Sequence, residues 1–223
     1  MTLTIKALPA LAVAAALAIA AAVVSHAPPA LAQSRASAQP LTGDLLAVQR
    51  HLEAMTSLTA DFTQTDRNGQ VQTGQLTLKQ PGRIRFQYAP GIPLLIVADG
   101  RSLNVIDYEV RQVQRWPIRN SPLAVLIDPA ANLVRYGQLR PTGNDNTLSV
   151  EVRDPARPEY GMITMIFTRD ARGPGGLSLY GWVALDAQRS RTSIRLSGQR
   201  YNATVADSVF RWRDPRPQGP RGR

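Results

Sequence analysis

The sequence predicts a mainly β fold, in which a large antiparallel sheet curves strongly or closes incompletely into a barrel, with helices over one face. Two observations lead to this class. About ten or eleven short segments alternate apolar and polar residues, as strands with one buried face do. Turn-forming pairs such as Pro81-Gly82 and Asp99-Gly100 separate these segments, and only two or three stretches have helical periodicity.

The clearest segments form a hairpin over residues 74–88. Leu76 and Leu78 alternate with polar residues, and so do Ile84, Phe86 and Tyr88. Because successive side chains of a strand point to opposite faces, each run has one apolar face. This pattern fits a sheet packed on a core and equally a sheet that curves around an apolar ligand.

The other expected elements follow in order along the chain. A first helix is expected at 43–55, where a stripe of apolar residues at helical spacing fits either core packing or contact with a ligand. A second, short apolar helix is expected from Ser121 to Ile127, with serine as its cap and proline at its first position. Further strands are expected at 58–65, 94–98, 103–108, 110–116, 147–153, 160–169, 177–185, 191–196 and 208–212.

The two ends of the chain differ in composition from the rest. Residues 1–32 contain one early charge, an apolar run too short to span a bilayer, and the small-x-small pattern Ala30-Leu31-Ala32. We therefore expect a secretory signal peptide that is cleaved after Ala32, followed by one domain over 33–212. Residues 213–223 are rich in Pro, Gly and Arg without apolar periodicity and are expected to be disordered.

The residue inventory disfavours catalysis. The chain has no cysteine and only two histidines, and one of these, His26, lies in the expected signal peptide. His51 alone forms no His/Cys metal site, and no G-x-S-x-G or glycine-rich phosphate motif is present. We expect no metal, no cofactor and a structural or surface role for His51. The net charge of +10 favours acidic partners, but no nucleic-acid-binding motif accompanies it.

Several segments, in order along the chain, resemble the LolA family of periplasmic outer-membrane lipoprotein carriers. Ala60-Asp61-Phe62-Thr63-Gln64 is similar to the S/A-x-F-x-Q opening of that family. Gly74-x-Leu76 and Gln80-Pro81-Gly82-x-Ile84-x-Phe86 resemble its G-x-L…R-P-x-x-F/M-R-W/F signature. Val97 to Leu103 resembles its D-G hairpin, and Asn120-Ser121-Pro122-Leu123 its T-P-x-x-L-L helix start. The ordered set runs from Thr42 to Trp212.

The resemblance implies an unclosed antiparallel barrel whose helices form a lid over an apolar cavity. It also implies a periplasmic, non-enzymatic monomer that carries acylated lipoproteins or lipids to the outer membrane. The partners would be an inner-membrane ABC-type transporter that releases lipoproteins and, as a further candidate, an outer-membrane receptor. The alternative function is an envelope-stress regulatory protein that senses lipids or lipoproteins with the same half-barrel, and an exported hydrolase using two carboxylates is a third.

The same resemblance assigns candidate site residues. The ligand-binding candidates are the apolar residues of one strand face together with those of the second helix: Phe62, Leu76, Leu78, Ile84, Phe86, Tyr88, Leu94, Ile96, Leu123, Val125 and Leu126. The family's arginine before the proline, which ties the lid shut, is Gln80 here, and Arg83 or Arg85 is a candidate substitute. Asn104 stands where the family commonly has an aromatic residue.

Overall fold

The computed structural model describes residues 43–118, 123–127 and 129–217. The chain divides into two units, Met1–Ser37 and Ala38–Arg223, and all described residues lie in the second. The expected signal peptide and the expected helix start at Ser121-Pro122 therefore lie outside the described residues. No helix among the described residues is long and apolar enough to cross a membrane.

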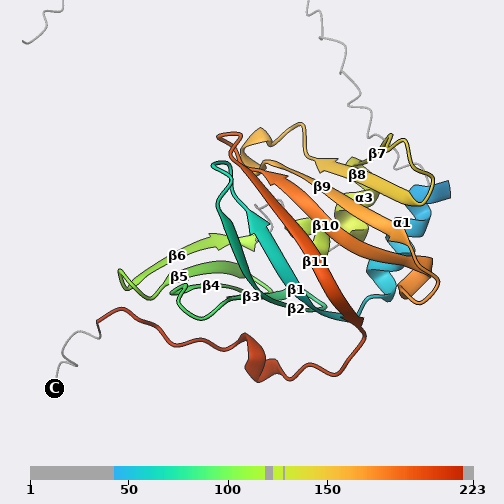
Figure 1. Cartoon of the computed structure of the whole chain (residues 1–223). Coiled ribbons are helices and arrows are strands. Elements are labelled where there is room, and N and C mark those ends of the chain that lie inside the picture. The colour runs from blue at the N-terminus through green and yellow to red at the C-terminus, as the bar shows by residue number, and fades with distance from the viewer. Residues whose placement is uncertain (1–42, 119–122, 128, 218–223) are drawn as a thin grey trace, which may run out of the picture. The chain divides into compact units, whose positions relative to one another are not determined.

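An eleven-stranded antiparallel sheet makes up most of the described part of the chain (Figure 1). Its strand order is β6-β5-β4-β3-β2-β1-β11-β10-β9-β8-β7, so the sheet is not closed and β6 and β7 are its edges. The strands are β1 (Ser57–Thr65), β2 (Val71–Lys79), β3 (Arg83–Tyr88), β4 (Leu94–Asp99), β5 (Ser102–Asp107), β6 (Gln112–Pro117), β7 (Gly137–Arg140), β8 (Thr147–Arg153), β9 (Met162–Arg169), β10 (Leu177–Leu185) and β11 (Arg191–Tyr201). The predicted fold class is confirmed.

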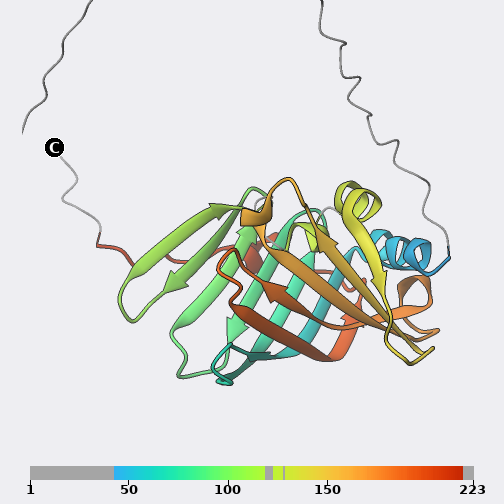
Figure 2. The same ribbon diagram turned by 90° about the horizontal axis from the view of Figure 1, so that it is seen from above.

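Three α-helices and three short 3-10 turns complete the described elements. They are α1 (Gly43–Ala54), α2 (Ala124–Ile127), α3 (Pro129–Tyr136), η2 (Pro158–Tyr160), η3 (Pro174–Gly176) and η4 (Asp207–Phe210). Figure 2 shows α1 and α3 together at one end of the sheet. Val48, Leu52 and Met55 of the α1 stripe are fully buried in the main core, so the stripe serves core packing.

The main core lies on the concave face of the sheet, and the strand register explains why. Leu76, Phe86 and Ile96 stand opposite one another on β2, β3 and β4. Residues that are directly opposite in an antiparallel sheet project from the same face, so these side chains form one apolar row. The row belongs to the same cluster as the buried residues of α1 and α2.

A second, smaller core lies on the outer face of the sheet. Leu95, Val97 and Ile106 project there and pack against Phe210. Phe210 belongs to a C-terminal segment, residues 202–217, which runs back across the outside of the sheet as the terminal red trace in Figure 1. We call this segment the strap.

Two expected strands differ from the structure, and one helix of the structure was not predicted. The strand expected at 208–212 is the 3-10 turn η4 followed by irregular chain, because its apolar residues Phe210 and Trp212 pack onto the outer face instead of pairing with a strand. The strand expected from Val110 begins at Gln112, because Val110 and Arg111 form the turn, with φ of 54° at Arg111. Helix α3 was not expected, because Pro129 was interpreted as a stop signal although proline also suits the first turn of a helix.

Candidate functional site

An apolar cavity lies inside the curve of the sheet. Its volume is about 220 Å³. Its walls come from β3–β5, from Leu123 just before α2, from the strands β1, β11 and β10, and from the turn between β10 and β11. The lining residues are Gln64, Phe86, Ile96, Leu103, Val105, Leu123, Trp182, Ala184, Asp186, Ser190, Thr192 and Ile194.

All eleven ligand-binding candidates from the sequence belong to the main core that surrounds this cavity. Phe86, Ile96 and Leu123 line the cavity directly. The other candidates pack behind or beside the lining without reaching it: Phe62, Leu76, Leu78, Ile84, Tyr88, Leu94, Val125 and Leu126. The strand alternation grouped the strand candidates on one face, and the family resemblance indicated that this face is concave. Packing within the core then decides which candidates reach the open space.

Aromatic rings hold the two sides of the curved sheet together. The Phe62 ring lies 5.4 Å from that of Phe86 and 5.2 Å from that of Tyr88, and Phe86 lies 6.1 Å from Trp182, measured between ring centroids. Strands β3 and β10 are four positions apart in the sheet, which would separate them by about 19 Å if the sheet were flat. The Phe86–Trp182 contact therefore requires the strong curvature that creates the cavity.

Gly74 makes room for this aromatic group. It stands opposite Phe62 in the register of β1 and β2. A Cβ atom at Gly74 would lie 2.8 Å from the Phe62 ring and 2.2 Å from the carbonyl oxygen of Gln87. Only glycine lets the ring of Phe62 lie flat across β2 at this point.

Several lining residues were not among the candidates from the sequence, and Trp182 is the most important of them. The pairing of β9 with β10 shifts between Leu179 and Gly181, which is a β-bulge. Leu177, Leu179 and Trp182 are all buried as a result, although simple alternation from Leu179 would put Trp182 on the opposite face. Leu103 and Val105 had a readable signal, because they alternate with polar residues on an expected strand.

A hydrogen bond joins Gln80 to the short helix α2. The Nε2 atom of Gln80 donates to the carbonyl oxygen of Leu126 at 2.7 Å. Leu123, just before α2, lines the cavity, and Val125 and Leu126 are buried in the main core. Gln80 therefore makes a direct contact with the element that covers the cavity.

The two candidate substitutes for the family arginine lie elsewhere. Arg83 pairs with Asp207 of the strap. Arg85 donates from Nη1 to the carbonyl oxygens of Val209 and Arg211, at 3.0 and 3.1 Å. Both arginines thus bind the strap on the outer face.

His51 and Asn104, which the sequence analysis considered individually, have structural roles. His51 is fully buried, its Nδ1–H donates to the carbonyl oxygen of Pro174 at 2.7 Å, and its ring meets those of Phe167 and Tyr201 edge-on. Asn104 is also fully buried, donates to the carbonyl oxygen of Val97 and accepts from Arg115 Nε at 2.9 Å. Among residues 43–118, 123–127 and 129–217, no group of three or more His, Cys, Asp or Glu is arranged to hold a metal ion.

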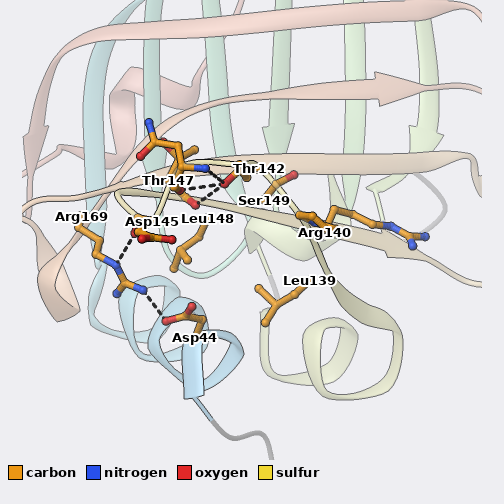
Figure 3. Close-up of a pocket in the computed structure, with 12 residues that line it drawn as sticks. Asp44, Leu139, Arg140, Thr142, Asp145, Thr147, Leu148, Ser149 and Arg169 are labelled. Carbon is orange, nitrogen blue, oxygen red and sulfur yellow. Dashed lines mark hydrogen bonds and ion pairs between the residues drawn. The ribbon is translucent and has the colours of Figure 1, made fainter.

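A second pocket, larger and open to solvent, lies between α1 and the hairpin of β7 and β8 (Figure 3). Its volume is about 650 Å³, and most of the residues that line it carry charged or polar side chains. Arg169 donates to Asp44 at 2.7 Å and to the carbonyl oxygen of Asp145 at 3.0 Å. Arg140 points away from this pair in Figure 3 and binds Glu151 at 2.7 Å. These internal ion pairs and the polar lining make the pocket a poor match for an acyl chain.

Comparisons with known proteins agree with the motifs. The family model described as "Outer membrane lipoprotein carrier protein LolA" matches residues 53–213. An outer-membrane lipoprotein carrier protein of Xanthomonas campestris is 31% identical over 167 residues, covering 70% of this chain and 77% of its own length. The protein of that description from Chromobacterium violaceum is 28% identical over 171 residues, covering 72% and 78%. A solved LolA superfamily protein from Nitrosomonas europaea is 13% identical, covers 77% of this chain and 99% of its own, and has a TM-score of 0.44.

Proposed function

Because the chain belongs to the LolA family of outer-membrane lipoprotein carrier proteins, we propose that it binds the acyl chains of lipoproteins released from the inner membrane and delivers them to the outer membrane. This carrier acts in the periplasm, to which the signal peptide over residues 1–32 directs it. The observation that best supports the proposal is the apolar cavity between the curved sheet and Leu123, just before α2.

The energetics of transfer explain why such a cavity serves a carrier. Each methylene group moved from water into an apolar environment gains about 0.8 kcal/mol, so an acyl chain crosses water at a prohibitive cost unless it is shielded. Phe86, Ile96 and Trp182 provide the shielding surface, together with Leu123 from the segment just before α2. Binding and release suffice for this task, so the function requires neither catalysis nor a cofactor.

The partners follow from the route of the cargo. An ABC-type transporter in the inner membrane supplies the lipoprotein, and the outer membrane or a receptor in it accepts the lipoprotein. The carrier works as a monomer, because one chain encloses the cavity. Nucleic acid has no part in this function.

A binding experiment with a synthetic triacylated lipopeptide tests the proposal. The purified protein should form a soluble one-to-one complex that native mass spectrometry detects. Phe86→Glu and Ile96→Glu, which place a charge on the cavity wall, should each weaken the complex at least tenfold, since an unpaired charge facing an acyl chain costs several kcal/mol.

Gln87→Glu is the matched control, because Gln87 lies beside Phe86 on the same strand and is exposed on the other face. It should bind like the wild type. Ile96 is only partly buried, so Ile96→Glu should fold even if Phe86→Glu does not. A folded Ile96→Glu protein with unchanged affinity, or a wild type that binds no lipopeptide, would refute the proposal.

A further inference from the structure

One end of the cavity lining is polar, in contrast to the rest. Trp182, Phe86 and Ile194 are only 2%, 4% and 6% exposed. The polar lining residues are more accessible: Gln64, Ser190 and Thr192 are partly exposed and Asp186 is exposed. They come from the end of β1, from the turn between β10 and β11, and from the start of β11. We call these four residues the polar rim, and it marks the side of the cavity that faces solvent.

The hydrogen bonds within the polar rim leave several groups available. Asp186 Oδ1 accepts the backbone N–H groups of Gln188 and Ser190, at 2.9 and 2.8 Å, which shapes the turn. Within the described part of the chain, neither Asp186 Oδ2 nor the hydroxyl of Thr192 forms a hydrogen bond or an ion pair with another side chain or backbone group. Ser190 Oγ accepts from Arg67 Nη1 at 3.5 Å, so the Ser190 hydroxyl hydrogen remains free to donate. The rim thus presents one charged acceptor beside two hydroxyl donors.

We propose that the polar rim binds the polar end of the acyl-bearing cargo and that Asp186 makes this site prefer a neutral amide or ester over an acyl carboxylate. This inference rests on the proposed function, because it assumes that acyl chains occupy the cavity. The hydroxyls of Ser190 and Thr192 donate to the carbonyl oxygen of an acyl amide or ester. Asp186 Oδ2 accepts from an adjacent N–H or O–H of the cargo.

Charge gives this arrangement its selectivity. A few polar groups in an otherwise apolar pocket fix the orientation of a ligand and supply most of its specificity. The acyl chain enters the apolar part, so a terminal carboxylate would lie against Asp186, where the two like charges repel. Arg67 contacts the Ser190 hydroxyl at 3.5 Å but forms no ion pair with Asp186 in the described part of the chain, so it reduces this repulsion without removing it.

Two ligands with the same acyl chain separate head-group recognition from chain burial. Palmitoyl ethanolamide is neutral and carries an amide and a hydroxyl, whereas palmitate is ionised at pH 8. Displacement of a fluorescent acyl probe gives the dissociation constant of each. The wild type should bind the ethanolamide about fivefold more tightly, the ratio expected for two like unit charges roughly 4 Å apart in water.

Asp186→Asn is the decisive variant, because its side-chain oxygen still accepts the two turn hydrogen bonds while the charge is removed. It should bring the two dissociation constants within about a factor of two of each other. Asp145→Asn removes a carboxylate from the other pocket and should keep the wild-type ratio. Thr192→Val, which keeps the shape of the side chain, should weaken binding of the ethanolamide severalfold by removing one donor.

The outcomes distinguish a failure of this inference from a failure of the proposed carrier function. A wild type that binds both ligands equally, or an Asp186→Asn variant that keeps the wild-type preference, overturns the inference and leaves the carrier function standing. An Asp186→Asn variant that loses both ligands in parallel also overturns it, because Asp186 would then support the turn and not select the ligand. A wild type that binds neither ligand refutes the carrier function itself.

Discussion

His51 shows how burial decides the role of a single residue. It is the only histidine among the described residues, and it lies on α1 facing η3, with its ring against Phe167 and Tyr201. Burial lowers the pKa of His51 below its usual 6.5, and the backbone carbonyls of Pro174 and Leu177 oppose this shift only in part. The folded protein therefore keeps His51 neutral at a pH where the unfolded chain protonates it.

The stability of the protein should depend on pH through this residue. Because the folded-state pKa lies below the unfolded value, the unfolded state binds more protons as the pH falls below about 6.5. The free energy of unfolding should therefore decrease between pH 7 and pH 5, as measured by urea denaturation. His51→Phe should remove most of this dependence. An equal slope in the wild type and in His51→Phe would show that other groups cause it.

Residue patterns predicted the faces of strands well and failed where a backbone irregularity intervenes. Alternation put Phe86 and Ile96 on the same face, the family resemblance indicated that this face is concave, and both residues line the cavity. Trp182 was not assigned, because the bulge before Gly181 shifts the side of the sheet on which later residues lie. A bulge depends on the pairing of two strands, so no pattern within one strand reveals it.

At the scale of elements, the strap braces the outside of the cavity wall. Lys79 donates to the carbonyl oxygen of Val205 at 2.7 Å and to Asp207 at 2.6 Å, and Arg83 also pairs with Asp207. Phe210 then packs on Leu95 and Val97, the outward-facing neighbours of Ile96 on β4. The strap thereby fixes the strand that presents Ile96 to the cavity.

Within the strap, residues 208–212 were expected to form a strand, and residues 213–223 were expected to be disordered. Its alternating apolar residues gave a strand-like signal, whereas their burial against the sheet needs no ladder partner. Beyond Trp212 the structure describes residues up to 217: the Tyr108 hydroxyl donates to the carbonyl oxygen of Arg213, and Arg216 pairs with Asp214. Residues 218–223 lie outside the described residues, so disorder of the last residues stays a prediction.

Loss of the Phe210 side chain should loosen the strap. Phe210 is 7% exposed, and a buried Phe→Ala change typically lowers the free energy of unfolding by about 3 kcal/mol or more. Hydrogen exchange should become faster in the strap and in β4 of Phe210→Ala. Val209→Ala, at a neighbouring position that is 36% exposed, should change stability by less than about 0.5 kcal/mol. Unchanged exchange in β4 would show that the strap does not brace the wall.

Lowering the pH toward 2 should detach residues 202–210 of the strap from the sheet. Hydrogen bonds from Arg83 and then Lys79 lower the pKa of Asp207 to about 2. A lowered carboxyl pKa stabilises the folded state above the ordinary value near 3.9, and this contribution is lost as the pH falls through about 2. Protease cleavage within 202–210 by pepsin should therefore accelerate between pH 4 and pH 2. Asp207→Asn should be cleaved rapidly across this whole range, and a wild-type rate in that variant would contradict the assignment.

The contact between Gln80 and α2 predicts how readily the cavity opens. A hydrogen bond from an uncharged amide contributes about 0.5–1.5 kcal/mol to stability, whereas a hydrogen bond from a charged donor contributes about 1.5–3 kcal/mol. Gln80→Arg should therefore favour the closed state by about 1 kcal/mol and slow the transfer of a fluorescent lipopeptide to acceptor vesicles severalfold. Gln80→Ala should accelerate it.

The control for this prediction is Gln75→Arg, the same chemical change at an exposed position of β2. Its transfer rate should equal that of the wild type. Neither Arg83 nor Arg85 compensates at Gln80, because both are bound to the strap. Equal transfer rates in the wild type, Gln80→Arg and Gln80→Ala would mean that this hydrogen bond does not govern opening.

At the scale of the whole molecule, the cavity is a consequence of sheet curvature. Local patterns predicted an unclosed sheet of about the right size, but the order of the strands places β1 between β2 and β11, which are distant in sequence. That central pairing lets the two halves of the sheet fold toward each other until Phe86 meets Trp182. Such a contact between distant segments has no signal in either segment alone.

Because the curvature places Trp182 in the cavity lining, its fluorescence should report whether an acyl chain occupies the cavity. The chain has three tryptophans, and Trp182 is the one that lines the cavity, whereas Trp212 packs in the outer core. An acyl chain brominated along its length quenches only tryptophans that it touches, so it should quench the wild-type fluorescence and lose most of this effect in Trp182→Phe. Trp212→Phe should keep the quenching.

Trp116 stands opposite Leu103 on the edge strand β6, outside the lining, and should contribute little. Quenching that persists in Trp182→Phe and disappears in Trp212→Phe would place the acyl chain on the outer face and contradict the assignment of the cavity.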